Sequence, residues 1–329
     1  KGFRWLILIR EIFYIPFTFI SIIYLKIKYR DFDIIHTNEI TDIIPALLCK
    51  IFFKSKHIVH CRSRYRNKVS SLRNKLLKNL LIKNIDFFIA IDENVKHSLP
   101  PDFNIIVVNN SFYQNLNNEN KIEKINIDKD PDTFKIGYIG TLSSSKGINN
   151  LLKSIILLKE QKANFHIYAA GSLTRKYSKI VSYILNSLGL IYEDYEKLIA
   201  YINLNGLKDH ITFLGNINNI GEFYSSIDIL CFPSKYNSPG RPVIEAAFFS
   251  KPSIVSVDDP KTDTLINNVT GIATKPNDDI DLSRAILDLA KNKIKRLELG
   301  LNAKKLYDKN FNPVINADKI YKLYSKITA

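Results

Sequence analysis

Two stretches of the sequence combine residue types that suit an anionic ligand, and the first is residues 140–147, Gly-Thr-Leu-Ser-Ser-Ser-Lys-Gly. Gly140 ends an apolar run and Lys146 opens an amphipathic helical pattern, so backbone N–H groups, hydroxyls and a cation could together cradle a phosphate. The stretch is not a P-loop, because Ser145 and Gly147 stand where that motif needs a glycine and a hydroxyl. A surface lysine without a ligand is the competing interpretation of Lys146.

The second stretch is residues 233–246, Pro-Ser-Lys-Tyr-Asn-Ser-Pro-Gly-Arg-Pro-Val-Ile-Glu-Ala. Pro242 suits the first position of a helix, which puts Glu245 in the first turn, where the helix dipole favours a carboxylate. Gly240 lets a ligand approach the backbone, and Arg241 offers bidentate donors to a phosphate. The competing interpretation is a glutamate that only stabilises its own helix.

Short apolar runs alternate with stretches of helical length, such as 41–53 and 69–84, and this alternation predicts βαβ units with parallel sheets. In such sheets ligands bind at the carboxyl ends of the strands, where both stretches would then lie. The expected strands are 33–36, 57–60, 87–91, 105–108, 135–140, 165–169, 211–214, 227–232 and 253–257.

The chain divides into two expected domains around a polar segment. Residues 1–113 form the first domain, which lacks a recognisable opening strand, glycine-rich turn and helix, and residues 114–132 form a linker rich in Asn, Lys, Asp and Glu. Residues 133–310 form a complete doubly wound domain, and residues 311–329 form a C-terminal helix expected to pack back toward the first domain. The sequence contains no Met, so we expect an N-terminally truncated chain.

These stretches, in this order, resemble the retaining glycosyltransferases of family 4. The resemblance is carried by Phe-Asp-Ile-Ile-His-Thr-Asn at 32–38, His-Ile-Val-His-Cys-Arg at 57–62, the loop at 140–147, Ala-Ala-Gly-Ser at 169–172, the strand at 211–215, and the segment 228–245 with its glutamate motif. It implies the α/β GT-B fold, in which two Rossmann-like doubly wound domains face each other across a cleft, the first domain here being incomplete.

The resemblance also implies roles for individual residues. The catalytic candidates are His60, Lys146 and Glu245. The donor-binding candidates are Gly140, Thr141, Lys146, Gly171, Asn237, Ser238, Pro239, Gly240, Arg241, Val243 and Glu245. Arg62, Arg64 and Arg66 would lie on the acceptor or membrane side. The family usually has a glutamate at the position of Asn237 and an arginine at that of Thr141, so a catalytically silent scaffold or regulatory subunit of a partner transferase is the alternative function.

The implied reaction moves a hexosyl group from a nucleotide-diphosphate sugar, with a UDP-sugar as the first expectation, to a glycan or lipid-linked acceptor in surface polysaccharide or glycolipid assembly. Lys146, Arg241 and the N–H groups near Gly240 would stabilise the charge on the departing diphosphate. Glu245 would accept hydrogen bonds from the ribose hydroxyls, and His60 would lie near the reacting sugar. Neither a cofactor nor a metal is implied.

The net charge of +15 is concentrated near the N-terminus, where 11 basic and no acidic residues lie between Asp42 and Asp86. The candidate partners are anionic lipid headgroups, a phosphorylated acceptor and nucleic acid, and no helix-turn-helix, RRM or zinc-finger signature supports the last. A solvated lysine-rich face is the competing interpretation. The uncharged run of 14 residues at 12–25 is too short to span a bilayer, so it predicts either a buried helix or a helix in the membrane interface.

Length and composition exclude two other classes of protein. With 329 residues, 46% hydrophobic and 24% charged, the chain is neither disordered nor a small disulfide-stapled scaffold. Its three cysteines, Cys49, Cys61 and Cys231, form no pairing pattern, which indicates a reducing compartment. We therefore expect a cytoplasmic protein, peripheral at the inner face of the membrane if the basic block binds lipid.

Overall fold

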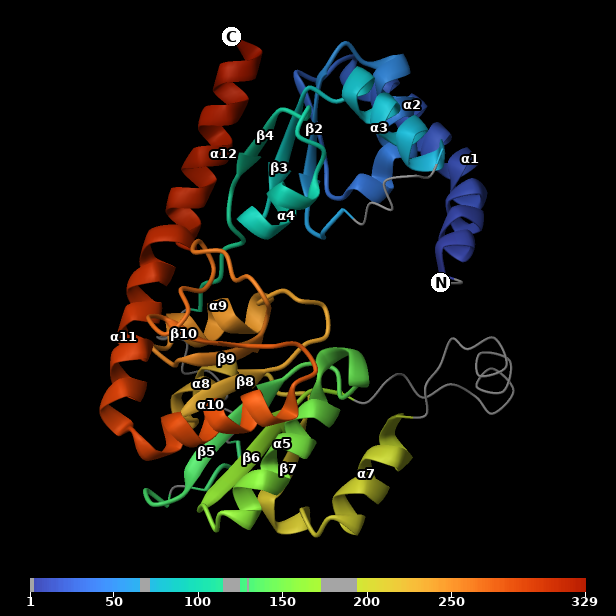
Figure 1. The fold of residues 1–329 in the computed structure, drawn as a ribbon. Helices are drawn as coiled ribbons and strands as arrows, with labels where there is room; N and C mark the ends of the chain where they lie inside the picture. Colours follow the sequence, from blue (N-terminus) through green and yellow to red (C-terminus); the bar gives the residue numbers. More distant parts are fainter. Residues whose placement is uncertain (1–2, 66–71, 115–124, 129, 173–193) are drawn as a thin grey trace. The chain divides into compact units, whose positions relative to one another are not determined.

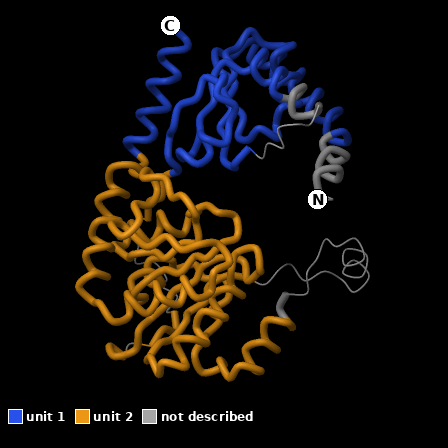
Figure 2. The backbone as a smooth tube through the Cα atoms, viewed as in Figure 1, with its two compact units in different colours: residues 1–110, 314–329 blue, residues 111–313 orange. Residues whose placement is uncertain are grey.

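The computed structural model describes residues 3–65, 72–114, 125–128, 130–172 and 194–329, which form two compact units. Unit 1 comprises residues 1–110 and 314–329, and unit 2 comprises residues 111–313. Figure 2 gives the C-terminal stretch the colour of the N-terminal one, so the chain leaves unit 1, builds unit 2 and returns. Each unit contains one parallel sheet, which confirms the α/β class predicted from the alternating pattern.

Unit 1 is built on four parallel strands in the order β1-β2-β3-β4. The strands are β1 Ile34–Thr37, β2 Lys56–Cys61, β3 Phe87–Ala90 and β4 Ile105–Val107, and the helices are α1 Phe3–Tyr29, α2 Ile43–Phe52, α3 Leu72–Asn84, α4 Glu93–Ser98 and α12 Pro313–Thr328. Most residues of β2 and β3 are buried and apolar, as expected where helices cover both faces of a parallel sheet.

The two faces of this sheet pack against different helices, because side chains alternate along a strand. Val59 of β2 belongs to a core that includes Ala46 of α2. Ile58 points to the other face, where Leu323 and Ile327 of α12 cover it. Figure 1 shows α12 running beside this sheet, so a segment from the far end of the chain completes the core of unit 1.

Helix α1 is exposed over most of the part whose side chains are described, so the expectation of a buried helix at 12–25 is wrong. One side chain, Ile22, is 4% exposed, and the ring of Phe19 contacts that of Phe52 in α2 at 5.5 Å. The opposite side carries an apolar stripe with exposed fractions of 58–77%, made of Phe13, Phe17, Ile20, Tyr24 and Ile27. Sequence periodicity could not reveal this, because both sides of the helix are apolar.

The helix also continues beyond the uncharged run, through Pro16 and on to Tyr29. By length and composition its window Ile12–Tyr29 could cross a membrane, and 6% of that window is buried. A single apolar helix of this kind near an N-terminus is weak evidence for a membrane span. It leaves the membrane interface as the surviving expectation for this segment.

Unit 2 contains six parallel strands in the order β10-β9-β8-β5-β6-β7. They are β5 Phe134–Ile139, β6 Phe165–Ala170, β7 Ile211–Gly215, β8 Ile229–Phe232, β9 Ser253–Ser256 and β10 Gly271–Thr274. The chain starts at β5, adds β6 and β7 on one side, and then crosses back to add β8, β9 and β10 on the other. The strand order therefore reverses between β5 and β8, which makes that point the topological switch of a doubly wound sheet.

Helices cover both faces of the sheet in unit 2. They are α5 Ile148–Glu160, α7 Asp194–Leu204, α8 Ile220–Ser226, α9 Arg241–Phe248, α10 Asp279–Lys291 and α11 Lys293–Asn310. Ile136 of β5 packs in one core with Leu151 of α5 and Ile286 of α10. Leu230 of β8 packs in the other core with Phe223 of α8. Each face of the sheet is thus sealed by apolar side chains.

Two features of unit 2 differ from the pattern expected from the sequence. Residues 111–113 fall in unit 2, and Ile127, inside the expected linker, is 7% exposed and packs in the core of this unit. Strand β10 has no counterpart among the expected strands. It is four residues long and starts at Gly271, so its propensity is weak, and its parallel pairing with β9 holds it in the sheet.

Candidate functional site

The loops after β5 and β8 are joined at the switch point, because these strands are neighbours in the sheet. The backbone N–H of Lys235 donates to the carbonyl of Ser145 at 3.1 Å. Gly147 has a φ of 85°, and a Cβ added to it would stand 1.8 Å from the carbonyl oxygen of Pro233. The two stretches singled out in the sequence therefore form one continuous edge, and this close approach requires glycine at 147.

Lys146 closes the short 3₁₀ turn Ser144–Lys146 that leads into α5. Its ammonium lies 5.7 Å from the ring centre of Phe232 and 5.4 Å from that of Tyr236. No carboxylate in the described part of the chain pairs with it within 4 Å. The rings therefore hold the ammonium without neutralising its charge, which stays available to an anion.

The end of β6 lies against the same edge. Gly171, with a φ of 135°, approaches the first loop so closely that an added Cβ would stand 2.0 Å from the carbonyl oxygen of Gly140. The N–H of Gly140 donates to the carbonyl of Ala170 at 2.9 Å, which ties the two strand ends together. Thr141 is exposed beside them, and its carbonyl accepts the hydroxyl of buried Tyr138 at 2.9 Å. Three strand ends thus meet with backbone close to the surface.

Helix α9 begins at this edge with an uncapped N-terminus. Gly240 is the N-cap residue with a φ of 75° and provides no side-chain cap, and the N–H of Val243 donates to its carbonyl at 3.3 Å. Arg241 is 69% exposed at the side chain, and its guanidinium lies 5.9 Å from the ring centre of Phe112. Free N–H groups, the positive end of the helix dipole and an exposed arginine form an arrangement suited to a phosphate. Pro239 and Val243 are buried, so they can offer backbone but not side chains.

Glu245 does not lie in the first turn as expected, because α9 already begins at Arg241. It is buried in the next turn, with 5% exposure, and both of its carboxylate oxygens have partners. Its Oε1 accepts from Nε of Arg241 at 2.7 Å, and its Oε2 accepts from the hydroxyl of Tyr224 in α8 at 2.9 Å. Burial raises the pKa of the carboxyl, while the bonds to Tyr224 and Arg241 oppose that rise. The same burial, with the nearby carboxylate, raises the pKa of Tyr224. Glu245 therefore fixes Arg241, and direct contact with a ribose stays a prediction.

Asn237 lies in the left-handed region with a φ of 53°, which asparagine tolerates better than most residues. Its Nδ2 donates to Oδ2 of Asp258 at 3.0 Å, and its Oδ1 accepts the backbone N–H of Asp258 at 2.9 Å. Asp258 is exposed and follows β9. The amide thus bridges the ends of β8 and β9, with Ser238 half-buried next to it. A sugar contact for Asn237 stays a prediction.

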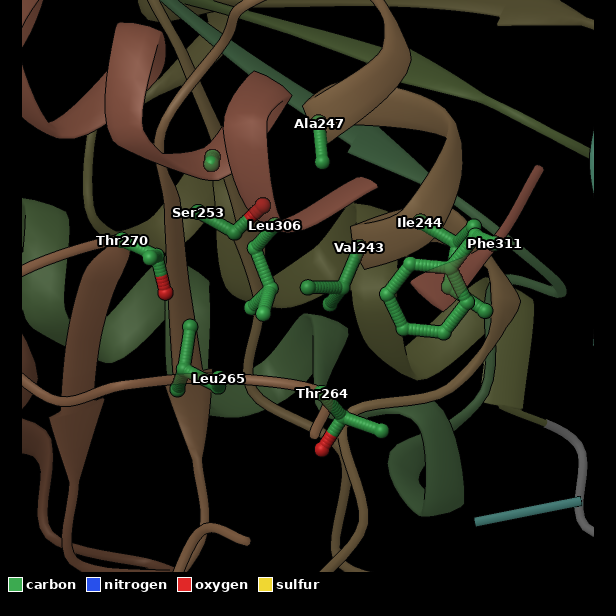
Figure 3. Close-up of a pocket in the computed structure, with 10 residues that line it drawn as sticks. Val243, Ile244, Ala247, Ser253, Thr264, Leu265, Thr270, Leu306 and Phe311 are labelled. Atoms are coloured by element: carbon green, nitrogen blue, oxygen red, sulfur yellow. The ribbon is translucent and has the colours of Figure 1, made fainter. Parts of the chain in front are cut away.

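Behind α9, on the side away from Glu245, lies a small cavity of about 10 Å³. Figure 3 shows the side chains that line it, among them Val243, Ile244, Ala247, Ser253, Thr264, Leu265, Thr270, Leu306 and Phe311. A volume of this size is at the lower limit for a single water molecule. The cavity is therefore a packing defect between α9 and its neighbours and has no room for a substrate.

In unit 1 the candidates lie at the carboxyl ends of β1 and β2. His60 is 7% exposed, and its pKa is lowered to about 4 by burial, by the charge of Arg62 and by His36. Arg62 and Arg64 are exposed in the loop after β2. Arg66 lies outside the described residues. The structure thus places His60 and Arg62 together in unit 1, and the donor candidates together in unit 2.

Sequence reasoning missed three residues that support these edges. Tyr224 bonds Glu245 from 21 positions away, Asp258 bonds Asn237 from 21 positions away, and Tyr324 bonds His36 from 288 positions away. None belongs to a local pattern. Asp258 could have been suspected, because it directly follows an expected strand at its carboxyl end. The two tyrosines gave no such signal.

The family model of glycosyl transferases group 1 matches residues 117–306. This match covers more than half of the 329 residues. The chain belongs to this family. It is a glycosyltransferase-family protein whose two parallel sheets are the two Rossmann-like domains of the GT-B fold.

Two curated glycosyltransferases are similar to this family member. An uncharacterised glycosyltransferase of Methanocaldococcus jannaschii is 25% identical over 324 residues, covering 90% of this chain and 76% of the relative. The capsular polysaccharide biosynthesis glycosyltransferase CapM of Staphylococcus aureus is 23% identical over 249 residues. That alignment covers 72% of this chain and 60% of CapM, less than two thirds of its length.

Solved GT-B glycosyltransferases share the fold. The Anabaena protein HepE in complex with UDP superposes with a TM-score of 0.74 at 17% identity, covering 94% of this chain and 82% of HepE. HepE in complex with UDP-glucose gives a TM-score of 0.68 at 17% identity, with 89% and 79% covered. A glycosyltransferase of Rickettsia africae gives 0.71 at 18% identity, with 94% and 80% covered. At such identities the similarity shows the fold alone.

Proposed function

We propose that this glycosyltransferase is a retaining, metal-independent family 4 enzyme that transfers a hexosyl group from a UDP-sugar to a glycan or lipid-linked acceptor. Its setting would be surface polysaccharide or glycolipid assembly, as the name of CapM suggests for that relative. The observation that carries the proposal is that Lys146 and Gly240, the residue before α9, both lie beside the ring of Phe232 at the switch point of unit 2. HepE, which shares the fold, binds UDP and UDP-glucose.

In the proposed chemistry the protein contributes mainly positive electrostatic potential. Negative charge builds on the diphosphate as the sugar leaves, and preorganised donors stabilise it without reorganising during the reaction. Lys146 supplies an ammonium held by two aromatic rings, Arg241 supplies a guanidinium, and Gly240 and Arg241 supply backbone N–H groups. His60 of unit 1 is proposed to approach the reacting sugar in its neutral form.

The proposed ribose contact requires a rearrangement at Glu245. Both carboxylate oxygens are engaged, by Arg241 and by Tyr224. Arg241 is the exposed partner, so a nucleotide phosphate can draw its guanidinium away and leave Oε1 for a ribose hydroxyl. Tyr224 would keep Oε2 occupied. In this scheme phosphate and ribose binding are coupled through one ion pair.

A ligand panel tests the proposal against its main alternative. Thermal stability of the full chain is measured with UDP, GDP, ADP, NAD and a DNA duplex, since a ligand that binds the folded state raises it. We expect UDP to stabilise the protein, and nucleotide release from a UDP-sugar to follow. Indifference to every nucleotide would favour a catalytically silent scaffold, the alternative suggested by Asn237 and Thr141.

A matched pair of lysine variants tests the switch-point site itself. Lys146→Ala should weaken UDP binding about 10- to 100-fold, as expected for the loss of a charged hydrogen bond. Lys295→Ala removes the same charge at the start of α11, where Lys295 pairs with Asp288 at 2.6 Å, and should leave UDP binding unchanged. Equal effects of the two substitutions would place the nucleotide elsewhere.

The stereochemistry and the metal independence have direct tests. NMR of the product, with a donor of known anomeric configuration, should show the same configuration at the new linkage if the reaction proceeds with retention. Activity should survive a chelator such as EDTA. Inversion at the anomeric carbon, or complete loss with EDTA and recovery with added metal, would overturn these parts of the proposal.

We further propose that the enzyme is cytoplasmic and binds the anionic inner face of the membrane through α1 and the basic block at 42–86. The apolar stripe of α1 and the lysines and arginines of the block offer two kinds of attraction. Salt screens the second and leaves the first. Vesicles that contain phosphatidylglycerol should therefore bind strongly at low salt and lose most of the protein at high salt.

Two variants separate these contributions. Phe17→Ser combined with Ile20→Ser should remove whatever binding survives high salt. Val314→Ser, on α12, changes an apolar residue that is 75% exposed and should have no effect. Failure of the wild-type protein to bind anionic vesicles, or equal binding to phosphatidylcholine alone, would reject the membrane partner without touching the donor site.

A further inference from the structure

The carboxyl edge of the sheet in unit 1 holds a group of polar side chains of which the proposed donor chemistry uses only His60. His36 lies in β1, His60 lies in β2, and Arg62 directly follows β2. All three lie at the edge where ligands bind in open parallel sheets. Together they form a basic site in which a hydrogen-bonding group and a positive charge lack partners among the described residues.

His60 is the buried member of this group. It is 7% exposed, and its Nε2 has no hydrogen-bond partner among the described residues. A neutral imidazole carries one donor and one acceptor, and a buried ring nitrogen without a partner is unfavourable. A ligand that offers an oxygen to Nε2 would restore the missing hydrogen bond. Nε2 is itself buried, so a ligand atom reaches it only when the ring or its neighbours shift.

His36 fixes the orientation of the His60 ring. The two rings stack with centres 5.5 Å apart and an angle of 26° between their planes. Nδ1 of His36 is hydrogen-bonded to the hydroxyl of Tyr324 on α12. Burial and the charge of Arg62 lower the pKa of His36 as well. Both imidazoles are thus held in place in their neutral forms beside a permanent cation.

Arg62 provides that cation in a prearranged position. Its Nε donates to Oδ1 of Asn38 at 2.6 Å, and its Nη1 donates to Oδ1 of Asn110 at 3.1 Å. Both acceptors are neutral, and no carboxylate of the described residues lies within salt-bridge distance of Arg62. The acidic neighbour Glu39 is engaged by Ser63 and by the N–H of Ile40. The guanidinium charge is therefore oriented but not compensated.

We propose that Arg62 and His60 bind a phosphate group of the acceptor substrate. Arg62 supplies the positive charge and its remaining N–H donors, and Nε2 of His60, protonated in the neutral ring, donates to a phosphate oxygen. Asn38, Asn110 and His36 act as positioning residues. The inference rests on the proposed transferase function and adds the chemical class of the acceptor, a phosphate ester. The ester is either carried by a lipid or part of a soluble sugar phosphate.

NMR of the histidine rings tests the site in the full chain. The protein is labelled with ¹³C-histidine, and the His60 signal is assigned from its absence in His60→Gln. Inorganic pyrophosphate is added at constant ionic strength and constant saturating UDP, so that the donor site is already filled. We expect the His60 signal to shift and its pKa to rise from about 4, since an adjacent anion stabilises the charged imidazole. His210 of unit 2 is the internal reference.

A charge-matched pair of variants assigns the effect to Arg62. Arg62→Gln should weaken pyrophosphate binding about tenfold or more, as for the loss of a charge-assisted pair. Lys326→Gln, which removes an exposed charge at the end of α12, should leave the binding unchanged. Both variants should bind UDP like the wild type. A His60 signal that ignores pyrophosphate, or equal binding by Arg62→Gln and wild type, overturns the inference.

The source of the phosphate is then decided by two further ligands. Glucose 1-phosphate represents a soluble sugar phosphate, and dihexadecyl phosphate in phosphatidylcholine vesicles represents a lipid carrier. The ligand that shifts the His60 signal in the wild type and not in Arg62→Gln identifies the source, whereas a neutral disaccharide that shifts it equally in both would contradict an anionic acceptor. If the wild type fails to bind UDP at all, the transferase proposal fails instead, and the two failures are distinguishable.

Discussion

The two sheets of this protein build their carboxyl edges, where the candidate sites lie, from different kinds of groups. In unit 2 the edge is made of backbone, since Gly147 packs against the carbonyl of Pro233 and Gly171 against that of Gly140. In unit 1 the edge is made of side chains, His36, His60 and Arg62, held by partners far apart in sequence. The same strand topology therefore offers one site shaped by glycine and another shaped by charge.

The electrostatics of the two edges differ accordingly. In unit 2 the partners of the cations leave them available to bind an anion. Lys146 lies over aromatic rings, and Arg241 pairs with buried Glu245. In unit 1 burial, together with the permanent charge of Arg62, lowers the pKa of both imidazoles. The stability of unit 2 should thus be sensitive to side-chain volume added at its glycines, and the stability of unit 1 to protonation of its histidines.

The largest expected effect comes from a substitution that disrupts the backbone edge of unit 2. Gly147→Ala puts a Cβ 1.8 Å from a carbonyl oxygen at a φ of 85°, so the loops must separate. We expect a loss of about 3 kcal/mol or more of unfolding free energy, from strain and steric overlap together. Hydrogen exchange of unit 2 amides, followed by mass spectrometry, measures it, and UDP binding should be lost.

Gly215→Ala is the matched control for that substitution. Gly215 also has a left-handed φ, 66°, but nothing lies within 4 Å of an added Cβ. Only backbone strain then remains, about 1 kcal/mol. If the two alanine substitutions cost the same, the close approach of the loops is not what requires glycine at 147.

The edge of unit 2 that holds the donor-binding candidates was largely predictable from the sequence, because its signals are local. Gly140, Gly147 and Gly240 each follow or precede a recognisable element, and the chain order of those elements predicts one edge. Partners such as Tyr224 and Asp258 were not predictable, because each bond depends on which strands become neighbours.

Local sequence patterns also could not predict the exposure of α1 or the side chains that meet at the edge of unit 1. An apolar helix gives no contrast between its faces, so composition could not say which side of α1 is packed. Tyr324 contacts His36 only because α12 returns to the sheet of unit 1. Strand β10 was missed because four residues that start with glycine carry little strand signal.

The second prediction concerns protons at the edge of unit 1. His60 has a pKa of about 4 in the folded state against 6.5 in the unfolded state. Between these values the unfolded chain binds more protons, so stability is lost as pH falls from 6.5 toward 4, by up to about 3 kcal/mol. His60→Gln should remove this part of the pH dependence, measured by hydrogen exchange of unit 1 amides.

Part of the pH dependence of stability should remain in His60→Gln, because burial also lowers the pKa of His36 and of His57. An identical slope in His60→Gln and wild type would mean that the imidazole is not buried in solution.

The third prediction asks whether Glu245 acts directly or through Arg241. Glu245→Ala should cost about 1.5–3 kcal/mol of UDP binding if a ribose hydroxyl bonds the carboxylate. Arg241→Ala and the double variant complete a cycle measured by calorimetry. Additive losses support a direct ribose contact, whereas a double variant no worse than Arg241→Ala would reduce Glu245 to a positioning residue for the arginine.

The smallest expected effect comes from the hydroxyl that holds Glu245 from behind. Tyr224→Phe leaves the carboxylate buried without one of its two donors, so its pKa, already raised by burial, should rise further. UDP binding should weaken by about 1 kcal/mol, and more so as pH falls, because the carboxyl then protonates more readily.

Tyr307→Phe is the control, since that buried hydroxyl donates to the backbone carbonyl of Phe112 and to no titrating group. It should lower stability without changing the pH dependence of UDP binding. A pH profile of Tyr224→Phe that matches the control would show that Glu245 stays ionised without its tyrosine, and that Arg241 alone maintains its charge.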